Sequence, residues 1–316
     1  MFEEEYFDAE DPVLVIGAAG IDIVGRLQSE ILSGTSNPAE IRMSFGGNAR
    51  NVAENLARLG QSVNLLTVVG QDLIGEQLLK QTAEAGVSIE HILTIDQHPT
   101  GSYLALVRKG ELEFALDDMR ITAALTPDYI RANQQLFEQS CLLFVDANLP
   151  AETLETVFEL AKASQLPVCA DPSSTSLALK FEPYLEDIFL FTPNRYEASL
   201  FCDDPQGQTE SERGLEFAKY LVTRGVEFAI VTQAEFGVSY ATSETSGQIR
   251  AIKTEIVDPT GGGDALSAAI MFAILNGIST DEAIRLGVSA ASLTLRHPGA
   301  AHPDLTLEKL YDQLVI

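Results

Sequence analysis

Near the carboxyl end of this 316-residue chain, the sequence reads Ile256-Val257-Asp258-Pro259-Thr260-Gly261-Gly262-Gly263-Asp264-Ala265-Leu266. Glycines adopt positive φ angles and let a ligand approach the backbone closely. Apolar residues then recur with the period of a helix, at Leu266, Ala269, Ile270, Ala273 and Ile274. The stretch therefore predicts a glycine turn that leads into a helix amino terminus, whose free N–H groups and positive dipole suit a bound phosphate.

A carboxylate at this turn, Asp264, needs its own explanation because it would repel a phosphate. It makes most sense as a base that takes a proton from an attacking hydroxyl. We therefore expect phosphoryl transfer, with Asp264 as the catalytic base and the N–H groups of Gly261, Gly262 and Gly263 as an anion hole. A simple helix cap by Asp264 is the alternative, because Asp is a favoured N-cap residue.

The composition limits the kinds of partner. The 46 acidic and 20 basic residues give a formal net charge of -26. Nucleic acids and anionic membranes are bound by basic patches, so we expect neither as a partner. The acidic amino terminus is unlike a signal or transit peptide, and no apolar run is long enough to span a membrane. We therefore expect a cytoplasmic protein.

The chain alternates between strand and helix patterns, which predicts parallel βαβ units and a sheet covered on both faces. Strand patterns lie at 13–16, 63–69, 141–145, 168–170, 188–192 and 228–232. Helical patterns lie at 46–60, 74–85, 151–164, 195–201, 210–224, 264–276 and 280–295. We expect one α/β domain over residues 1–316.

Two segments do not fit this core, and they predict a small β-sheet lid over the ligand end of the main sheet. The first, about 22–45, looks irregular from residue 23 until an alternating strand at 41–45. The second, about 100–118, reads as a hairpin with strands at 103–107 and 111–116 around Arg108-Lys109-Gly110.

Four motifs in order now resemble those of the ribokinase-like (PfkB) family of carbohydrate and nucleoside kinases, over nearly the whole chain. They are Gly46-Gly47-Asn48-Ala49-Arg50-Asn51-Val52-Ala53-Glu54-Asn55-Leu56-Ala57-Arg58-Leu59-Gly60, Val69-Gly70-Gln71-Asp72-Leu73-Ile74-Gly75, Thr192-Pro193-Asn194-Arg195-Tyr196-Glu197, and Asp258 to Asp264. The resemblance implies a three-layer α/β/α fold with a mostly parallel central sheet and a β-sheet lid. It also implies an ATP-dependent phosphotransferase with an alcohol acceptor that uses Mg²⁺.

Shorter matches are similar to the pseudouridine kinase subgroup of that family. They are Ser36-Asn37-Pro38, Asp117-Asp118-Met119-Arg120-Ile121-Thr122, Asp146-Ala147-Asn148-Leu149 and His302-Pro303-Asp304-Leu305. They imply phosphorylation of a nucleoside 5′-hydroxyl, with pseudouridine as the leading acceptor. Other family acceptors (ribose, fructose or adenosine) and a catalytically silent binding protein remain alternatives. A Rossmann dehydrogenase does not fit, because Gly17-Ala18-Ala19-Gly20-Ile21-Asp22 is not a GxGxxG motif.

The residues expected to bind the acceptor are Asp22, Gly46, Gly47, Asn48, Asn51, Tyr103 and Asp118. The resemblance implies this role for Asp22, whereas Tyr103 and Asp118 are chosen because they lie on and just past the lid hairpin. Asp22 would accept hydrogen bonds from a ribose diol, although a plain turn residue is the alternative. The Asn51 amide can donate to and accept from sugar hydroxyls, although a helix-surface residue is the alternative. Tyr103 could contact the acceptor, although packing within the lid is slightly favoured.

The nucleotide and its metal ion are assigned in the same way. Thr232, Gly237, Thr260 and Asn194 would border the nucleotide. Asn194 and Glu197 would hold Mg²⁺ through water, and a helix-capping pair is the alternative. Asp258 could help to bind a monovalent cation such as K⁺. The chain departs from the family pattern at Ala234, which replaces a glycine, and at Pro259 and Gly262. Exposed lid strands often need cover, so a homodimer through the lid is a further expectation.

Overall fold

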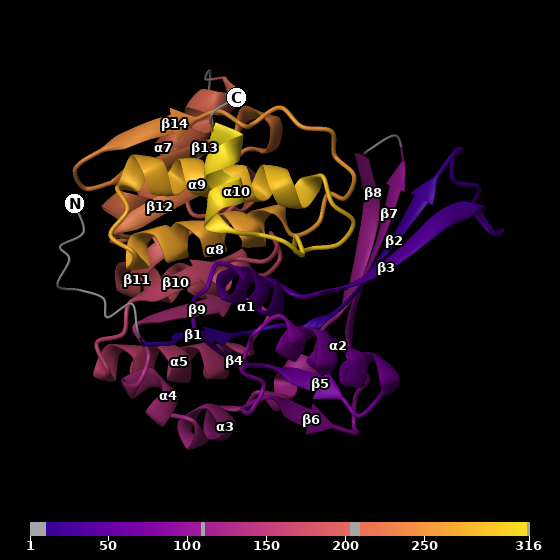
Figure 1. Cartoon of the computed structure of the whole chain (residues 1–316), viewed down its shortest axis with the longest axis horizontal. Helices are drawn as coiled ribbons and strands as arrows, with labels where there is room; N and C mark the ends of the chain where they lie inside the picture. The colour runs from indigo at the N-terminus through magenta and orange to yellow at the C-terminus, as the bar shows by residue number, and fades with distance from the viewer. Residues whose placement is uncertain (1–10, 109–110, 203–208, 315–316) are drawn as a thin grey trace.

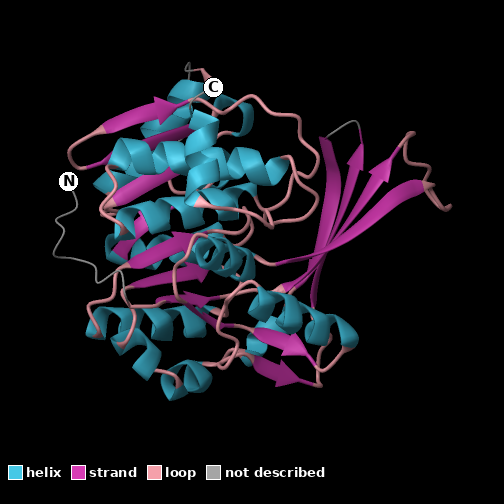
Figure 2. Cartoon of the chain, viewed as in Figure 1, coloured by secondary structure: helices cyan, strands magenta, loops and turns pink. Residues whose placement is uncertain are grey.

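The structure is a computed structural model of the chain, and it describes residues 11–108, 111–202 and 209–314. The acidic amino terminus and the hairpin turn at Lys109-Gly110 lie outside the described residues. A layered α/β body carries a twisted sheet that projects from one side (Figures 1 and 2). No helix in the described ranges is both long and apolar enough to cross a membrane.

The body is built on an eight-stranded sheet with the order β14-β13-β12-β11-β10-β9-β1-β4. In that order the strands are Ser246–Ile249, Val238–Thr242, Phe228–Thr232, Ile188–Phe191, Val168–Asp171, Leu142–Asp146, Val13–Ile16 and Val63–Leu66. From β12 to β4 all neighbours pair in parallel, and β13 and β14 add antiparallel strands at one edge. The expected mostly parallel central sheet is therefore confirmed.

Both faces of this sheet are buried, as the continuous apolar strands predict. In β1, Val13 and Val15 belong to one core cluster, and Leu14 and Ile16 belong to the other. The first cluster includes helices α1 (Asn48–Arg58), α8 (Gly262–Leu275), α9 (Thr280–Leu295) and α10 (Leu307–Leu314). The second includes α3 (Pro127–Ala132), α4 (Gln135–Glu138), α5 (Ala151–Ala163), α6 (Arg195–Ala198) and α7 (Glu210–Thr223). The fold therefore has the three α/β/α layers.

The projecting sheet, called the lid below, has the strand order β3-β2-β7-β8. Its strands are Ala39–Gly46, Gly20–Leu27, Gly101–Arg108 and Glu111–Asp118. The sequence interpretation of residues 23–27 as irregular was wrong, because β2 runs through them and pairs with both β3 and β7. A glycine and charged side chains interrupt its apolar pattern, so only its neighbours in the sheet reveal the strand.

One strand predicted as continuous is divided between two sheets. Residues 63–69 contain β4 of the main sheet and the start of β5 (Val68–Gly70), which pairs with β6 (Leu93–Ile95). The side chain of Thr67 lies at the break and donates a hydrogen bond to the carbonyl of Gly17 (2.6 Å). Helix α2 (Leu73–Glu84) follows β5 and packs near the base of the lid.

Candidate active site

The glycine turn at Gly261 begins helix α8, as its sequence predicts. Gly261 is the N-cap residue, with φ 74°, and an added Cβ would lie 1.9 Å from the carbonyl oxygen of Ala300. Only glycine fits this conformation and this close approach. Asp264 lies in the first turn of the helix and is not its cap. The helix-cap alternative for Asp264 is therefore wrong, and its carboxylate makes its contacts with another element.

Those contacts are two amides from helix α1. Asn51 Nδ2 donates to Asp264 Oδ2 (2.8 Å), and Asn48 Nδ2 donates to Oδ1 (3.1 Å). Burial raises the pKa of Asp264 to about 7, against the two amide hydrogen bonds, which lower it. A carboxyl with a pKa near neutrality is suited to accept a proton from a hydroxyl and to release it again. The two amides fix the direction in which its lone pairs point.

A second buried carboxyl, Asp22, lies in lid strand β2. Burial, and then the negative charges of Asp264 and Asp258, raise its pKa to about 7, while Arg50 opposes the shift. Gly46 makes room for it, because an added Cβ there would lie 2.2 Å from Asp22 Oδ2. Asp22 of the lid therefore lies close enough to Asp264 of α8 for the two negative charges to repel each other.

The lid register decides which other side chains share the face of Asp22. Asp22 pairs with Tyr103 of β7, which in turn pairs with Asp117 of β8. Asp118 pairs with Ser102, so it lies on the opposite face of the sheet, where it forms an ion pair with Arg120 (2.7 Å). The structure therefore does not bring Asp118 to Asp22, and Asp117 takes the place expected for it. Tyr103 packs against Val24, Ala105 and Val107 in the lid, as its packing alternative predicts.

A cavity of about 670 Å³ lies beside the glycine turn. Thr232, Gly237, Gly262 and Gly263 line it, together with apolar side chains of α8 and α9 that include Leu266, Val288 and Leu295. An apolar cavity of this size with a few polar groups is typical of sites for small molecules. Ala234, which replaces a family glycine, adopts φ 48° at its rim. The turn keeps a conformation that glycine would favour, despite the added methyl group.

Asn194 and Glu197 form a capping box at the start of α6. Asn194 Oδ1 accepts from the N–H groups of Tyr196 and Glu197, and Glu197 Oε2 accepts from the N–H group of Asn194 (2.7 Å). These contacts agree with the helix-capping alternative for Asn194 and Glu197. Burial raises the pKa of Glu197, which is well enclosed. No three His, Cys, Asp or Glu side chains in the described ranges are arranged to hold a metal ion directly.

Asp258 and Thr260 hold the chain just before the glycine turn. Asp258 Oδ1 accepts from the Thr260 hydroxyl (2.7 Å) and N–H (3.1 Å), and Oδ2 accepts from the N–H of Gly299 (3.1 Å). These bonds tie the turn to the segment after α9. The direct role of Asp258 in the structure is to organise this turn.

Two further carboxyls belong to the same region, although the motifs did not assign them a role. Asp146 ends β9 and accepts from the N–H groups of Ala18 (2.8 Å) and Ala49 (3.1 Å), which fixes the start of α1. Asp171 ends β10, and burial, followed by the charges of Glu197 and Asp264, raises its pKa well above its usual value. Both residues could have been predicted from the sequence, because a polar residue at the carboxyl end of a buried parallel strand indicates a ligand-binding edge.

Comparison with known proteins agrees with this arrangement. The sequence profile described as "pfkB family carbohydrate kinase" matches residues 11–307. The chain is 31% identical to the pseudouridine kinase of Escherichia coli (strain K12) over 300 residues, 94% of this chain and 95% of that protein. It is 27% identical to the guanosine-inosine kinase of Exiguobacterium acetylicum over 283 residues, 89% of this chain and 93% of that protein.

Among solved structures, Arabidopsis thaliana ribokinase complexed with ribose and ATP has the same fold. It matches with a TM-score of 0.82 and 20% identity over 97% of this chain and 99% of that one. The chain therefore belongs to the PfkB family of carbohydrate kinases, has the ribokinase-like fold, and is a sugar or nucleoside kinase, a phosphotransferase with an alcohol group as acceptor.

Proposed function

We propose that this kinase transfers the γ-phosphoryl group of ATP to the 5′-hydroxyl of a nucleoside, with pseudouridine as its leading acceptor. The observation that carries the phosphoryl transfer is the buried Asp264 carboxylate, held by Asn48 and Asn51 next to a glycine turn that lines a cavity. The similarity to pseudouridine kinase over nearly the whole chain supports the acceptor. The similarity to a guanosine-inosine kinase supports a nucleoside more generally.

In this proposal, Asp264 takes the proton from the acceptor hydroxyl as that oxygen attacks the phosphorus atom. The N–H groups of Gly261, Gly262 and Gly263 stabilise the charge on the phosphoryl oxygens, which is the main demand of this reaction. Asp22 accepts hydrogen bonds from the sugar diol and so sets the distance between the attacking oxygen and the phosphorus atom. The lid carries Asp22 and Tyr103, so its position controls how the acceptor is held.

ATP would occupy the cavity that Thr232, Gly237, Gly262 and Gly263 line, with Thr260 and Asn194 near its phosphates. Magnesium would neutralise charge on those phosphates. Glu197 fits a water-mediated magnesium site, since its burial close to Asp171 leaves two carboxylates whose repulsion a cation would relieve. A monovalent cation near Asp258 is a separate expectation, tested by comparing rates in KCl and NaCl.

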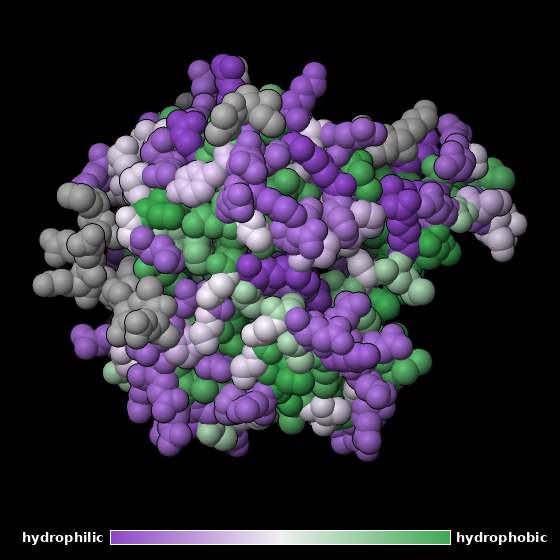
Figure 3. All heavy atoms as spheres, in the orientation of Figure 1, coloured by the Kyte–Doolittle hydropathy of each residue, from purple (hydrophilic) through white to green (hydrophobic). Residues whose placement is uncertain are grey.

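We also propose that two chains associate through the lid. Met43, Leu104 and Leu116 lie in one cross-strand row on its outer face, and they are 69%, 36% and 63% exposed. A hollow of about 270 Å³ on the same face is lined by Ile23, Ile41 and Leu106, and Figure 3 shows hydrophobic residues among the side chains of the projecting sheet. A second copy is the fitting occupant, because the same apolar row on both chains is complementary to itself.

The experiment that tests the acceptor is coupled ADP release with ATP and Mg²⁺ against pseudouridine, uridine, adenosine, guanosine, ribose and fructose. We expect the highest kcat/KM with pseudouridine. A preference for ribose or a purine nucleoside would keep the kinase and discard pseudouridine. Tight acceptor binding without turnover on any of the six would instead favour a silent binding protein.

A further inference from the structure

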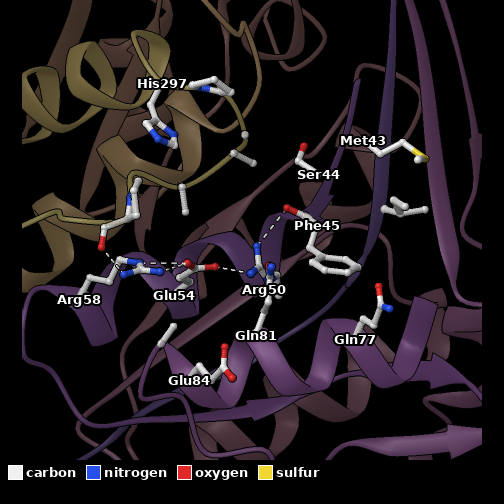
Figure 4. A pocket seen from close by; sticks show the side chains of 17 residues that line it. Met43, Ser44, Phe45, Arg50, Glu54, Arg58, Gln77, Gln81, Glu84 and His297 are labelled. Carbon is white, nitrogen blue, oxygen red and sulfur yellow. Dashed lines mark hydrogen bonds and ion pairs between the residues drawn. The ribbon is translucent and has the colours of Figure 1, made fainter. Parts of the chain in front are cut away.

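A second cavity lies outside the lid, at its base. It has a volume of about 610 Å³ and is enclosed by α1, α2, strand β3 and the segment after α9. Figure 4 shows Arg50, Glu54 and Arg58 on one side of it, Phe45 and Met43 of β3 on another, and His297 above. Among the described residues, those that line it are all different from those that line the cavity beside the glycine turn. Its size lies within the range of small-molecule sites.

Three charged side chains of α1 form an ion ladder along one wall. Glu54 lies between Arg50 and Arg58, which are four residues to either side of it, and forms an ion pair with each. Arg58 Nη1 also donates to the carbonyl of Pro303. One carboxylate therefore serves two guanidinium groups, and this wall carries a surplus of one positive charge in a chain whose formal net charge is -26.

Further cationic and imidazole groups gather above this ladder. His297 lines the cavity, and its buried Nδ1 has no hydrogen-bond partner within the described ranges. Its ring lies 5.2 Å from that of His302. Burial, and then His297, Lys309 and Arg58, lower the pKa of His302, against Asp304, which raises it. The lowered pKa favours the neutral ring of His302, and Lys309 is paired with Asp304, so the net positive charge at this cavity comes from Arg50 and Arg58, which share the single carboxylate of Glu54.

The rest of the lining is largely apolar, which indicates that the ligand has carbon surface as well as charge. Ile21, Phe45, Pro298 and Pro303 contribute carbon surface. The amides of Gln77 and Gln81 lie one helical turn apart on α2, and both border the cavity. Glu84 also borders it, but lies within 3.9 Å of Lys80. An inorganic ion would leave most of this volume and carbon surface unused.

We propose that this cavity is a second binding site for a small organic anion, with a carboxylate or phosphate group on a short carbon skeleton. The acidic group lies between Arg58 and His297, and the skeleton packs against Phe45 and Pro298. The guanidinium of Arg58 gives the charge-assisted hydrogen bonds that such a group requires. His297 Nδ1, which has no partner within the described ranges, offers a further hydrogen-bonding position. The site goes beyond the kinase activity and requires neither ATP nor the acceptor to be bound.

Hydrogen bonds connect this site to the catalytic region. Arg50 Nη1 donates to the carbonyl of Phe45 (3.0 Å) and to Asn51 Oδ1 (3.3 Å). Asn51 in turn donates to Asp264. An anion that draws Arg58 away from Glu54 leaves Glu54 paired with Arg50 alone. A shift of Arg50 toward Glu54 would change its hydrogen bonds to Phe45 of the lid strand and to Asn51. We therefore expect occupation to alter the apparent KM of the acceptor, because hydrogen-bond networks of this kind can carry coupling between two sites.

Calorimetric titration of the full chain, without ATP or acceptor, tests the site independently of catalysis. The probes are citrate, succinate and glycerol 3-phosphate, with inorganic phosphate and chloride at matched ionic strength. We expect saturable one-to-one binding of at least one organic probe and weaker binding of both inorganic ions. Arg58→Gln and His297→Asn each weaken that binding by about tenfold or more, as the loss of a charge-assisted bond does.

Arg131→Gln is the matched control, because it removes the same charge from a surface pair with Glu159 far from this cavity. Binding to that variant should equal binding to the wild type. Three results would overturn the proposal: no organic probe binds, Arg131→Gln weakens binding as much as Arg58→Gln does, or ATP displaces the probe competitively. None of them bears on whether the protein phosphorylates a nucleoside.

Discussion

The side-chain amide of Asn51 donates a 2.8 Å hydrogen bond to the carboxylate of Asp264, although the two residues lie 213 positions apart. Asn51 belongs to helix α1, and Asp264 lies at the glycine turn near the carboxyl end. The bond opposes the rise in the pKa of Asp264 that burial causes. It therefore joins two of the sequence motifs into one site and sets both the direction and the basicity of the carboxylate.

Replacement of that amide tests its role. In Asn51→Ala, the carboxylate loses a charge-assisted hydrogen bond, and we expect kcat/KM to fall by about 10- to 100-fold. The pH at which kcat/KM is half-maximal should rise, because one of the groups that lower the pKa of Asp264 is gone. Steady-state rates between pH 5.5 and 9 measure both effects. Asn276→Ala, at the other end of α8 and bonded to Phe272, should change neither.

The pH dependence of stability follows from the same carboxyls. The pKa values of Asp22 and Asp264 are raised to about 7 from an ordinary 3.8, so the folded chain binds more protons than the unfolded chain between about pH 4 and 7. The free energy of unfolding should therefore fall as the pH rises through this window. Catalysis should change in the opposite direction, since the proton acceptor must be ionised.

Urea unfolding at several pH values measures this effect. Asp22→Asn should flatten the fall in unfolding free energy between pH 5 and 7.5, because the amide does not titrate. Asp118→Asn, which changes an exposed carboxyl on the other face of the lid, should leave the slope as it is. A wild-type free energy of unfolding that increases over this interval would contradict the pKa shifts.

The role proposed for Glu197 differs from that of a helix cap, and one substitution separates the two. Glu197→Gln keeps an oxygen that can accept from the N–H group of Asn194, so the cap and the fold should persist. The Mg²⁺ concentration for half-maximal rate should rise by about tenfold, because the buried negative charge is lost. A magnesium titration of the rate at saturating ATP measures it.

Another capping box supplies the control for that titration. Thr209 and Glu212 form the same pair at the start of α7, where Glu212 is exposed. Glu212→Gln should leave the magnesium dependence unchanged. Equal magnesium dependence in the wild type and in Glu197→Gln would assign Glu197 to the cap alone.

The proposed lid interface predicts a change of assembly state. Met43→Lys and Leu116→Lys each place a charge in the apolar row, and we expect the dimer to dissociate at micromolar concentration. Light scattering after size-exclusion chromatography gives the mass directly. Leu179→Lys charges another exposed leucine away from the lid and should not change the mass. A monomeric wild type would refute the interface.

The sequence predicts the body of the fold well and its lid less well, for a physical reason. Helix α8 and the glycine turn were predictable because Gly261 and the apolar period of α8 act locally. The lid segment at about 22–45 was predicted, but the bounds of strand β2 within it were not, because they depend on pairing with β3 and β7. The face of the lid on which Asp118 lies could not be predicted for the same reason, since a shift of one residue in register moves every side chain to the other face of a sheet.

For the candidate site, the motifs led to residues that the fold brings together, but not to their contacts. The amide bonds from Asn48 and Asn51 to Asp264 join distant parts of the sequence, and no spacing encodes them. Asp171 received no role because it stands alone after a short strand, and Asp146 entered only as the first residue of a short motif without a role of its own. Their importance comes from burial at the shared edge of the sheet, which depends on the strand order.

The most direct test of the account is the rate of ADP release by Asp264→Asn with ATP, Mg²⁺ and the best acceptor. The amide has nearly the same shape but cannot accept the hydroxyl proton, so we predict that kcat falls by about 100- to 10,000-fold while the circular dichroism spectrum is unchanged. The melting temperature at pH 8 should not fall, because a buried negative charge is removed. A folded Asp264→Asn variant with a kcat near that of the wild type would contradict the assignment of Asp264 as the catalytic base.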